Sequence, residues 1–174
     1  MAIYELDGKR PLIAPDAFVH PKAVIIGEAS IGSGCFIGPG AVIRADFGPI
    51  SVGDFSTVQD NAVLHVSPGD RVVIEERVII AHGVLLHDAH IHSLCIVGMG
   101  AVVLQKVVCE RGCMIAAGSV VPHGMRIPAG KLIAGNPARI IKDVGPGFES
   151  RVLAGIETYR KITEKHRETM KKIG

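Results

Sequence analysis

The sequence predicts an all-β protein, a parallel β-helix of hexapeptide repeats followed by a C-terminal α-helix. Three observations lead to this prediction: an aliphatic residue returns every six positions, aromatic residues make up only 4% of a chain with 21 glycines, and the C-terminal segment changes to a helical spacing. Short β-branched runs between turn residues indicate short strands, and a fixed short period indicates that the strands stack in successive coils. We therefore expect a β-helix domain over residues 1–143 and a helix that packs on it within residues 144–174.

The repeat is clearest when hexads are counted from Phe18, because the second position of each hexad is then almost always aliphatic. Insertions of three residues after Asp46 and after His65 interrupt the period. Such insertions often form loops on the binding face of a repeat protein. A narrow prism has room for one branched side chain per rung and little room for rings, which agrees with the absence of tryptophan. The residues expected to point into the prism are Val19, Ile25, Ile31, Ile37, Ile43, Val52, Val58, Leu64, Val73, Ile79, Leu85, Ile91, Val97, Val103, Cys109, Ile115, Val121, Ile127 and Ile133.

The cysteines follow the repeat. Cys35, Cys95 and Cys113 occupy the sixth position of their hexads, which is usually small, and Cys109 occupies an aliphatic position. We expect all four to be buried thiols that behave as small hydrophobic side chains, not zinc ligands.

The tail after Pro146 and Gly147 is expected to form a helix that covers the prism. Ser150 is the expected N-cap, because its hydroxyl can accept a backbone hydrogen bond. Apolar side chains then recur at helical spacing, and the charged residues between them are expected to face solvent. The apolar positions are Phe148, Val152, Ile156, Tyr159 and Ile162.

Composition narrows the possible partners. The formal net charge is only +2, which gives no basic surface for nucleic acid. No apolar run is long enough to span a membrane, and the first residues lack the basic and apolar regions of a secretion signal. Four cysteines are too few for a disulfide scaffold. We expect a reduced, cytoplasmic protein without a membrane or nucleic-acid partner.

Four polar motifs in the repeat, which occur in the same order, resemble the gamma-class carbonic anhydrase family of the hexapeptide-repeat superfamily. Residues 3–8 and 18–21 resemble a sub-branch linked to phenylacetate degradation and carnitine metabolism. Over roughly residues 11–143, the resemblance implies a left-handed β-helix with three hexads per coil and assembly as a homotrimer. The four motifs are Val42–Asp46, Val58–Asn61, Val63–His65 and Ala81–His87.

With three hexads per coil, His65 lies one coil from His87 on the same face, and adjacent strands are about 4.8 Å apart. Two imidazoles at that spacing can share a metal ion. His82 lies on the preceding face and points away within one chain, so a neighbouring subunit would supply it, and the resemblance implies the same division. Three imidazoles suit zinc, with iron or cobalt as alternatives, and leave a fourth position open for water. His90 and His92 are expected to be ordinary rung residues.

The resemblance implies reversible, zinc-dependent hydration of carbon dioxide to bicarbonate by a metal-bound hydroxide at the trimer interface. Zinc lowers the pKa of its bound water to about 7, so hydroxide is available at neutral pH. Gln59 would orient the hydroxide or the gas molecule, and Arg44 would hold the bicarbonate anion. Asp46 and Asp60 would steady the arginine network, and Tyr159 would reach the pocket from the tail helix.

The chain departs from the founding members of the family in two places. Phe47 follows the Arg-x-Asp motif where those enzymes carry an acid, and the loop Val66–Asp70 is short, with one acid in place of a proton-shuttling glutamate. Both departures bear on hydration activity more than on metal binding. Two alternatives therefore stay open: an acyl-CoA thioesterase or acyltransferase of the same fold, and a non-catalytic metal-binding trimer.

Overall fold

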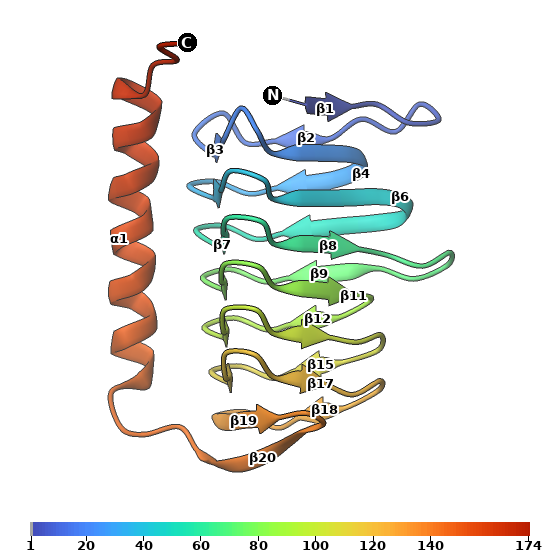
Figure 1. Ribbon diagram of the computed structural model, residues 1–174, viewed down its shortest axis with the longest axis vertical. Coiled ribbons are helices and arrows are strands. Elements are labelled where there is room, and N and C mark those ends of the chain that lie inside the picture. The colour runs from blue at the N-terminus through green and yellow to red at the C-terminus, as the bar shows by residue number, and fades with distance from the viewer. Residues whose placement is uncertain (1) are drawn as a thin grey trace.

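Short strands stack into a three-sided prism, and one long helix runs beside it (Figure 1). The computed structural model describes residues 2–174. The N-terminus and the end of the helix lie at the same end of the prism (Figure 1). The elements are β1 (Ala2–Tyr4), β2 (Leu12–Ile13), β3 (Phe18–Val19), β4 (Val24–Ile31), β5 (Phe36–Ile37), β6 (Val42–Val52), β7 (Thr57–Val58), β8 (Val63–His65), β9 (Val72–Ile74), β10 (Ile79–Ile80), β11 (Leu85–His87), β12 (His90–Ile91), β13 (Ile96–Val97), β14 (Val102–Val103), β15 (Val108–Cys109), β16 (Met114–Ile115), β17 (Val120–Val121), β18 (Arg126–Ile127), β19 (Lys131–Gly135), β20 (Ala138–Asp143) and α1 (Phe148–Thr169).

Two sheets make the three faces. An eight-stranded sheet forms one face, with β3, β5, β7, β10, β13, β16 and β19 in parallel and β20 antiparallel at its end. A twelve-stranded sheet bends around a corner and forms the other two faces. Its strand β6 shows the bend, because its first part pairs with β8 and its last part pairs with β9. The result is the left-handed parallel β-helix with a C-terminal helix that the sequence predicts.

Aliphatic side chains from every coil fill the prism. They form the column of inward-pointing residues, here called the ladder, that the sequence predicts. Ile25, Ile43, Leu64 and Ile115 have no exposed surface. Strand residues alternate between the two sides of a sheet, so each inward residue is flanked by outward ones. The four cysteines are also buried and unpaired, as expected.

The predicted register was wrong over one stretch. Val73, Ile79 and Leu85 were expected to point inward, but the inward residues are Ile74, Ile80 and Leu86. Leu85 is 48% exposed, whereas Leu86 is 2% exposed. A slip of one residue moves a side chain to the opposite face of a strand.

The slip has a simple origin in the lengths of the coils. Leu64 pairs with Leu86, 22 residues further along, so the second insertion adds four residues to the 18 of a regular coil. Leu86 then pairs with Val103 after only 17 residues, because the corner between Leu86 and Ile91 is one residue short. The two errors cancel, and the predicted ladder is correct again from Ile91 onward.

Helix α1 begins earlier than predicted. Its N-cap is Gly147, which has a φ of 78° and makes no side-chain capping hydrogen bond, so the prediction of Ser150 as N-cap was wrong. The start is set by burial: Phe148 is 4% exposed and packs with Val152 and Ile156 against Leu94. That contact places Ser150 inside the first turn.

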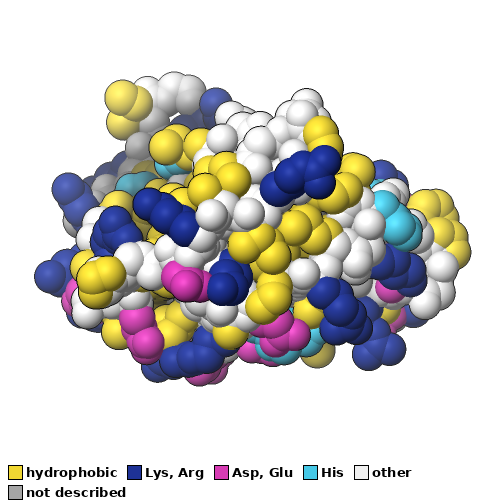
Figure 2. Space-filling model, turned by 90° about the horizontal axis from the view of Figure 1, so that it is seen from below, with side chains coloured by type: hydrophobic (Ala, Val, Ile, Leu, Met, Phe, Trp, Pro, Cys, Tyr) yellow, Lys and Arg dark blue, Asp and Glu magenta, His cyan; other side chains and the backbone are white. Residues whose placement is uncertain are grey.

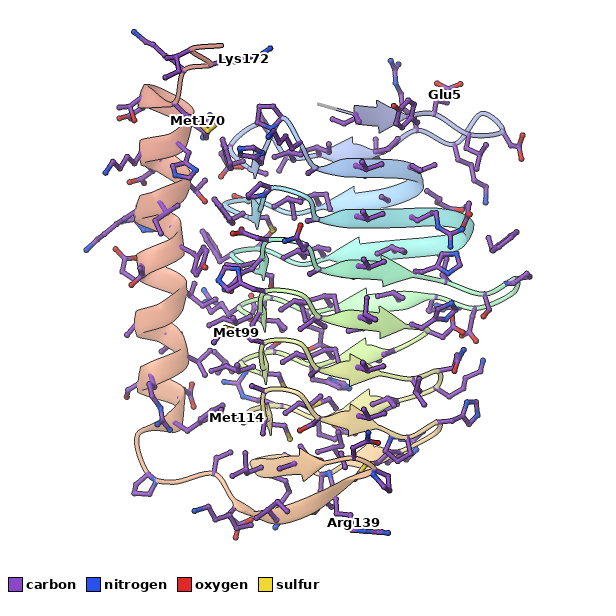
Figure 3. The ribbon with its side chains drawn as sticks, in the orientation of Figure 1. Glu5, Met99, Met114, Arg139, Met170 and Lys172 are labelled. Carbon is purple, nitrogen blue, oxygen red and sulfur yellow. The ribbon has the colours of Figure 1, made fainter. Side chains whose placement is uncertain are left out.

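The helix runs back along the prism toward the N-terminal coils. Met114 lies beside its first turns and Met170 beside its end (Figure 3). Near that end, Arg167 donates hydrogen bonds to the carbonyl oxygens of Pro15 and Asp16. The helix therefore ties the last coils to the first.

Each end of the prism is covered. Strands β1 and β2 pair with β4 at the N-terminal end, and β20 folds back on β19 at the other. Seen from the β20 end, hydrophobic side chains alternate with lysine and arginine over the surface (Figure 2). Within residues 2–174, no helix combines the length and apolar character needed to cross a bilayer.

Candidate metal centre

His65 and His87 face each other across two neighbouring coils. They end β8 and β11 and are directly paired in the sheet. Nδ1 of His65 lies 2.9 Å from Nε2 of His87, and the ring planes are nearly perpendicular at 88°. Two ligands of a tetrahedral zinc ion, each 2.0–2.1 Å from it, are about 3.3 Å apart. The two nitrogens are therefore close to the spacing that a shared ion requires.

The second nitrogen of His65 faces a carboxylate. Nε2 lies 3.0 Å from Oδ1 of Asp46, whose other oxygen forms an ion pair with Arg44. Burial raises the pKa of Asp46, but the hydrogen bonds from Arg44 and His65 outweigh it and hold the pKa below its ordinary value. Strand β6 brings Arg44 directly opposite His65, so the three side chains form one connected group.

The second nitrogen of His87 also faces a carboxylate, and this one was not found from the sequence. Nδ1 lies 3.0 Å from Oδ2 of Asp88, without the alignment of a hydrogen bond, and it is otherwise buried without a partner. Asp88 has a φ of 46°, sits in the short corner, and accepts a hydrogen bond from the Ser67 amide at 2.6 Å. Burial raises the pKa of Asp88, but the hydrogen bonds from Ser67 and the nearby His87 imidazole hold it below its ordinary value.

His82 lies on a different corner of the prism. Its Nδ1 is 3.5 Å from Oδ2 of Asp60, and among residues 2–174 its nitrogens do not converge with those of His65 and His87 within 4.8 Å. Gln59, beside Asp60, is 5% exposed, and its amide donates to the hydroxyl of Thr57 at 3.4 Å. One chain therefore presents the expected site residues as two separate groups.

Tyr159 belongs with the second group. Its ring packs on Phe36 at a centroid distance of 5.2 Å, which fixes the tail helix against the prism. Burial, and then the charge of Asp60, raise the pKa of the Tyr159 hydroxyl. At neutral pH it is therefore a protonated donor near Asp60.

The two departures from the family pattern also lie beside the histidine pair. Phe47 is 54% exposed, and its ring is 5.9 Å from that of His65. The single acid of the short loop, Asp70, forms an ion pair with Lys106 from a later coil. Neither the phenyl ring nor the paired carboxylate is suited to carry a proton away from the histidines.

The donor set fits a divalent metal ion. Each histidine of the pair turns one nitrogen toward the other histidine and its second nitrogen toward a carboxylate, Asp46 or Asp88. A carboxylate behind a ligating imidazole fixes its tautomer and orientation, and this arrangement is usual for metal-bound histidines. Two imidazoles alone leave a zinc site incomplete, because catalytic sites have three protein ligands.

Comparisons with known proteins show which family the chain belongs to. The family described as bacterial transferase hexapeptide (six repeats) matches residues 10–45. Gamma carbonic anhydrase 1, a mitochondrial protein of Arabidopsis thaliana, is 34% identical over 164 residues, which cover 91% of this chain. The match spans only 60% of the plant protein.

Two further proteins resemble the chain over more of their length. The carnitine operon protein CaiE of Salmonella agona (strain SL483) is 35% identical over 144 residues, which cover 83% of this chain and 73% of CaiE. The crystal structure of a candidate acetyltransferase from Bacillus cereus has a TM-score of 0.93 and 32% identity, covering 95% of this chain and 96% of that one.

Fold and motifs together define a left-handed β-helix of the hexapeptide-repeat class. Within that class, this chain belongs to the family branch that contains gamma carbonic anhydrases and CaiE.

Proposed function

We propose that this protein is a metal-dependent enzyme that hydrates carbon dioxide reversibly to bicarbonate. The observation that carries the proposal is the His65–His87 pair, with each outer nitrogen backed by a carboxylate. Structural histidines on a solvent face do not require two oriented carboxylates, whereas metal ligands commonly have them. The similarity to gamma carbonic anhydrase 1 supports the same reaction class.

The proposed metal is zinc, with iron or cobalt as alternatives, held by His65 and His87 of one chain and His82 of a neighbouring subunit. When bound, zinc supplies Lewis acidity that lowers the pKa of a coordinated water to about 7. The chain's own residues then have three tasks: to hold the ligands, to position the anion and to exclude water.

Arg44 is the residue we assign to bicarbonate. Its side chain is 41% exposed and only Nη1 pairs with Asp46, so the guanidinium has donors left for an anion. A planar guanidinium can bind two oxygens of a carboxylate-like group at once. Asp46 then has two roles, because it orients Arg44 and the imidazole of His65 together.

Gln59, Asp60 and Tyr159 are assigned to the opposite wall of the site, beside His82. The buried Gln59 amide has donors and an acceptor with which to orient a small polar molecule. Asp60 faces Nδ1 of His82, so the nitrogen we assign to a ligand bond is Nε2. Tyr159 is assigned to the wall of the pocket, not to proton transfer, because its pKa is raised.

The proposed assembly is a homotrimer in which the two groups of site residues meet between subunits. Large apolar side chains are exposed near both groups. Phe47 and Leu85 lie beside the histidine pair, and Met99 lies one coil from His82, with exposed fractions of 54%, 48% and 59%. Exposed apolar side chains of this size favour association between proteins.

The direct test is a stopped-flow assay of carbon dioxide hydration on zinc-loaded protein. We expect turnover above the buffer rate, and its loss in the His82→Ala and His65→Ala variants. The exposed His123 supplies the matched control, since His123→Ala should change neither zinc content nor rate. Full zinc occupancy without hydration would reject the proposed activity.

A mixing experiment tests the shared ligands. His82→Ala subunits keep the histidine pair, and His65→Ala subunits keep His82. After co-refolding equal amounts, about a quarter of the interfaces in a cyclic trimer should carry a complete ligand set. Recovery of zinc binding to that extent supports the division between subunits, and no recovery contradicts it.

An acyltransferase is the second candidate, because the Bacillus cereus structure is named for that activity. Consumption of acetyl-CoA with amine or alcohol acceptors, and hydrolysis of acyl-CoA in their absence, would reveal transferase or thioesterase activity. If these activities persist in His82→Ala, they do not depend on the proposed metal.

A further inference from the structure

A second histidine cluster lies on another face of the prism, and it is complete within one chain. Glu75 follows β9, while His90 and His92 flank the inward Ile91 of β12 in the next coil. Oε1 of Glu75 lies 3.0 Å from Nε2 of His90 and 2.9 Å from Nδ1 of His92. All three atoms fall within 4.8 Å of one another.

The carboxylate is held in a fixed orientation. Its other oxygen, Oε2, accepts hydrogen bonds from the amide and the hydroxyl of Ser93, both at 2.9 Å. This leaves Oε1 to face the two imidazoles. The imidazole rings lie almost parallel, with centroids 4.0 Å apart and an angle of 15° between the planes. Two imidazole nitrogens and one carboxylate oxygen are thus gathered at one place by the protein itself.

The far side of His92 is supported as well. Its Nε2 lies 3.7 Å from Oε2 of Glu110, which follows β15 one coil further on. A carboxylate behind a histidine orients the ring toward a metal on its other nitrogen. Glu75, His92 and Glu110 therefore lie one above the other in successive coils, and His90 contacts Glu75 from the side.

We infer that Glu75, His90 and His92 form a second metal site, which binds a divalent transition ion such as zinc within a single chain. Two imidazoles and one carboxylate are a common ligand set for zinc and iron. Calcium and magnesium prefer oxygen ligands alone, so the two nitrogens select against them. The side chains are half-exposed, with fractions between 27% and 37%, so an ion can enter from solvent.

This site is separate from the histidine pair. In Figure 1, β8 and β11 point away from helix α1, whereas β9 and β12 point toward it. The two clusters lie on adjoining faces, because β8 and β11 belong to one arm of the twelve-stranded sheet and β9 and β12 belong to the other. The inference does not depend on the proposed enzymatic function, because it needs neither His82 nor a neighbouring subunit.

Zinc titration of the full-length protein, stripped with a chelator and followed by metal counting, tests the inference. We expect two ions per chain in the wild type, one in His82→Ala and none in His82→Ala combined with Glu75→Gln. His92→Ala in the same background is a second route to the same loss. Ser93→Ala keeps the amide donor but removes the hydroxyl, and it should weaken binding about 10-fold.

Two controls make the result decisive. The His123→Ala variant removes an exposed imidazole elsewhere and should keep both ions, and magnesium alone should not bind at the second site. If the histidine pair holds no ion, the wild type should bind one zinc that Glu75→Gln removes, which would refute the proposed enzyme site and leave this one standing. Unchanged stoichiometry in both Glu75→Gln and His92→Ala, with folding intact by circular dichroism, would overturn the inference.

Discussion

The irregular coils of residues 43–92 and the regular coils of residues 97–133 differ in what they contribute. In the regular stretch the inward residue returns every six positions, and each one from Val97 to Ile133 is at most 1% exposed. In the irregular stretch, successive coils take 21, 22 and 17 residues. Among residues 2–174, every close histidine–carboxylate contact has its histidine in the irregular stretch.

This difference indicates that the packing of the inward-pointing residues and the placement of the histidine–carboxylate groups depend on different parts of the chain. A regular corner leaves little freedom, because each residue must serve the packing of the coil above and the coil below. An inserted or deleted residue changes where a corner turns and lets polar side chains from two coils meet. The His87–Asp88 corner shows this, since it is the one that is a residue short. The predictions below test the separation, beginning with the largest effect.

The largest effect is expected from truncating the ladder itself. Ile115→Ala in the regular stretch and Leu86→Ala in the irregular stretch should each lower the free energy of unfolding by about 2–5 kcal/mol, because each leaves a cavity in a fully packed core. Chemical denaturation of metal-free protein measures this cost.

Metal binding should distinguish the same two variants. Leu86 precedes His87, so Leu86→Ala should also weaken zinc affinity, whereas Ile115→Ala should not. Equal loss of affinity in both variants would contradict the separation of the two regions. If Leu86→Ala instead left the free energy of unfolding unchanged, that result would contradict the corrected register.

A smaller effect is expected from the carboxylate behind His87. Asp88→Asn keeps a side chain that tolerates a φ of 46°, but it removes the charge that orients the imidazole. Zinc affinity should fall by about 10–100-fold, as is usual for such supporting groups. Isothermal titration measures the change.

Asp54 offers the matched control for that measurement. It also accepts a backbone hydrogen bond across coils, from the Ser33 amide at 2.8 Å, but it faces no histidine. Asp54→Asn should therefore leave zinc affinity unchanged. If Asp88→Asn behaves in the same way, the buried carboxylate has no part in holding the ligand.

The sequence was sufficient for the fold and for the neighbourhood of His65 and His87, because a fixed period places residues one coil apart on the same face. It was not sufficient for the register of Leu85 and Leu86, since an extra residue and a missing one cancel within a short stretch. Nor did it reveal Asp88, or the contact of Glu75 with His90 and His92. These contacts depend on the backbone path at the corners between strands. The six-residue period predicts which residues point inward, but it does not predict that path. The short spacing from Leu86 to Ile91 was the sequence signal from which an irregular corner could have been predicted.

The smallest effect should come from a carboxylate that serves structure alone. Asp16 accepts hydrogen bonds from the hydroxyl of Ser33 at 2.6 Å and from the amide of Gly34 at 3.1 Å, and the Ser33 bond lowers its pKa. A lowered pKa in the folded state means that the stabilisation is present above the ordinary pKa and is lost as the pH falls through the folded value. Asp16→Ala should therefore cost about 1 kcal/mol at pH 7, a modest figure because the group is partly exposed. The difference from the wild type should shrink as the pH drops below about 4. Zinc content should stay the same, and a change in zinc content would show that the N-terminal coils and the histidine sites are coupled after all.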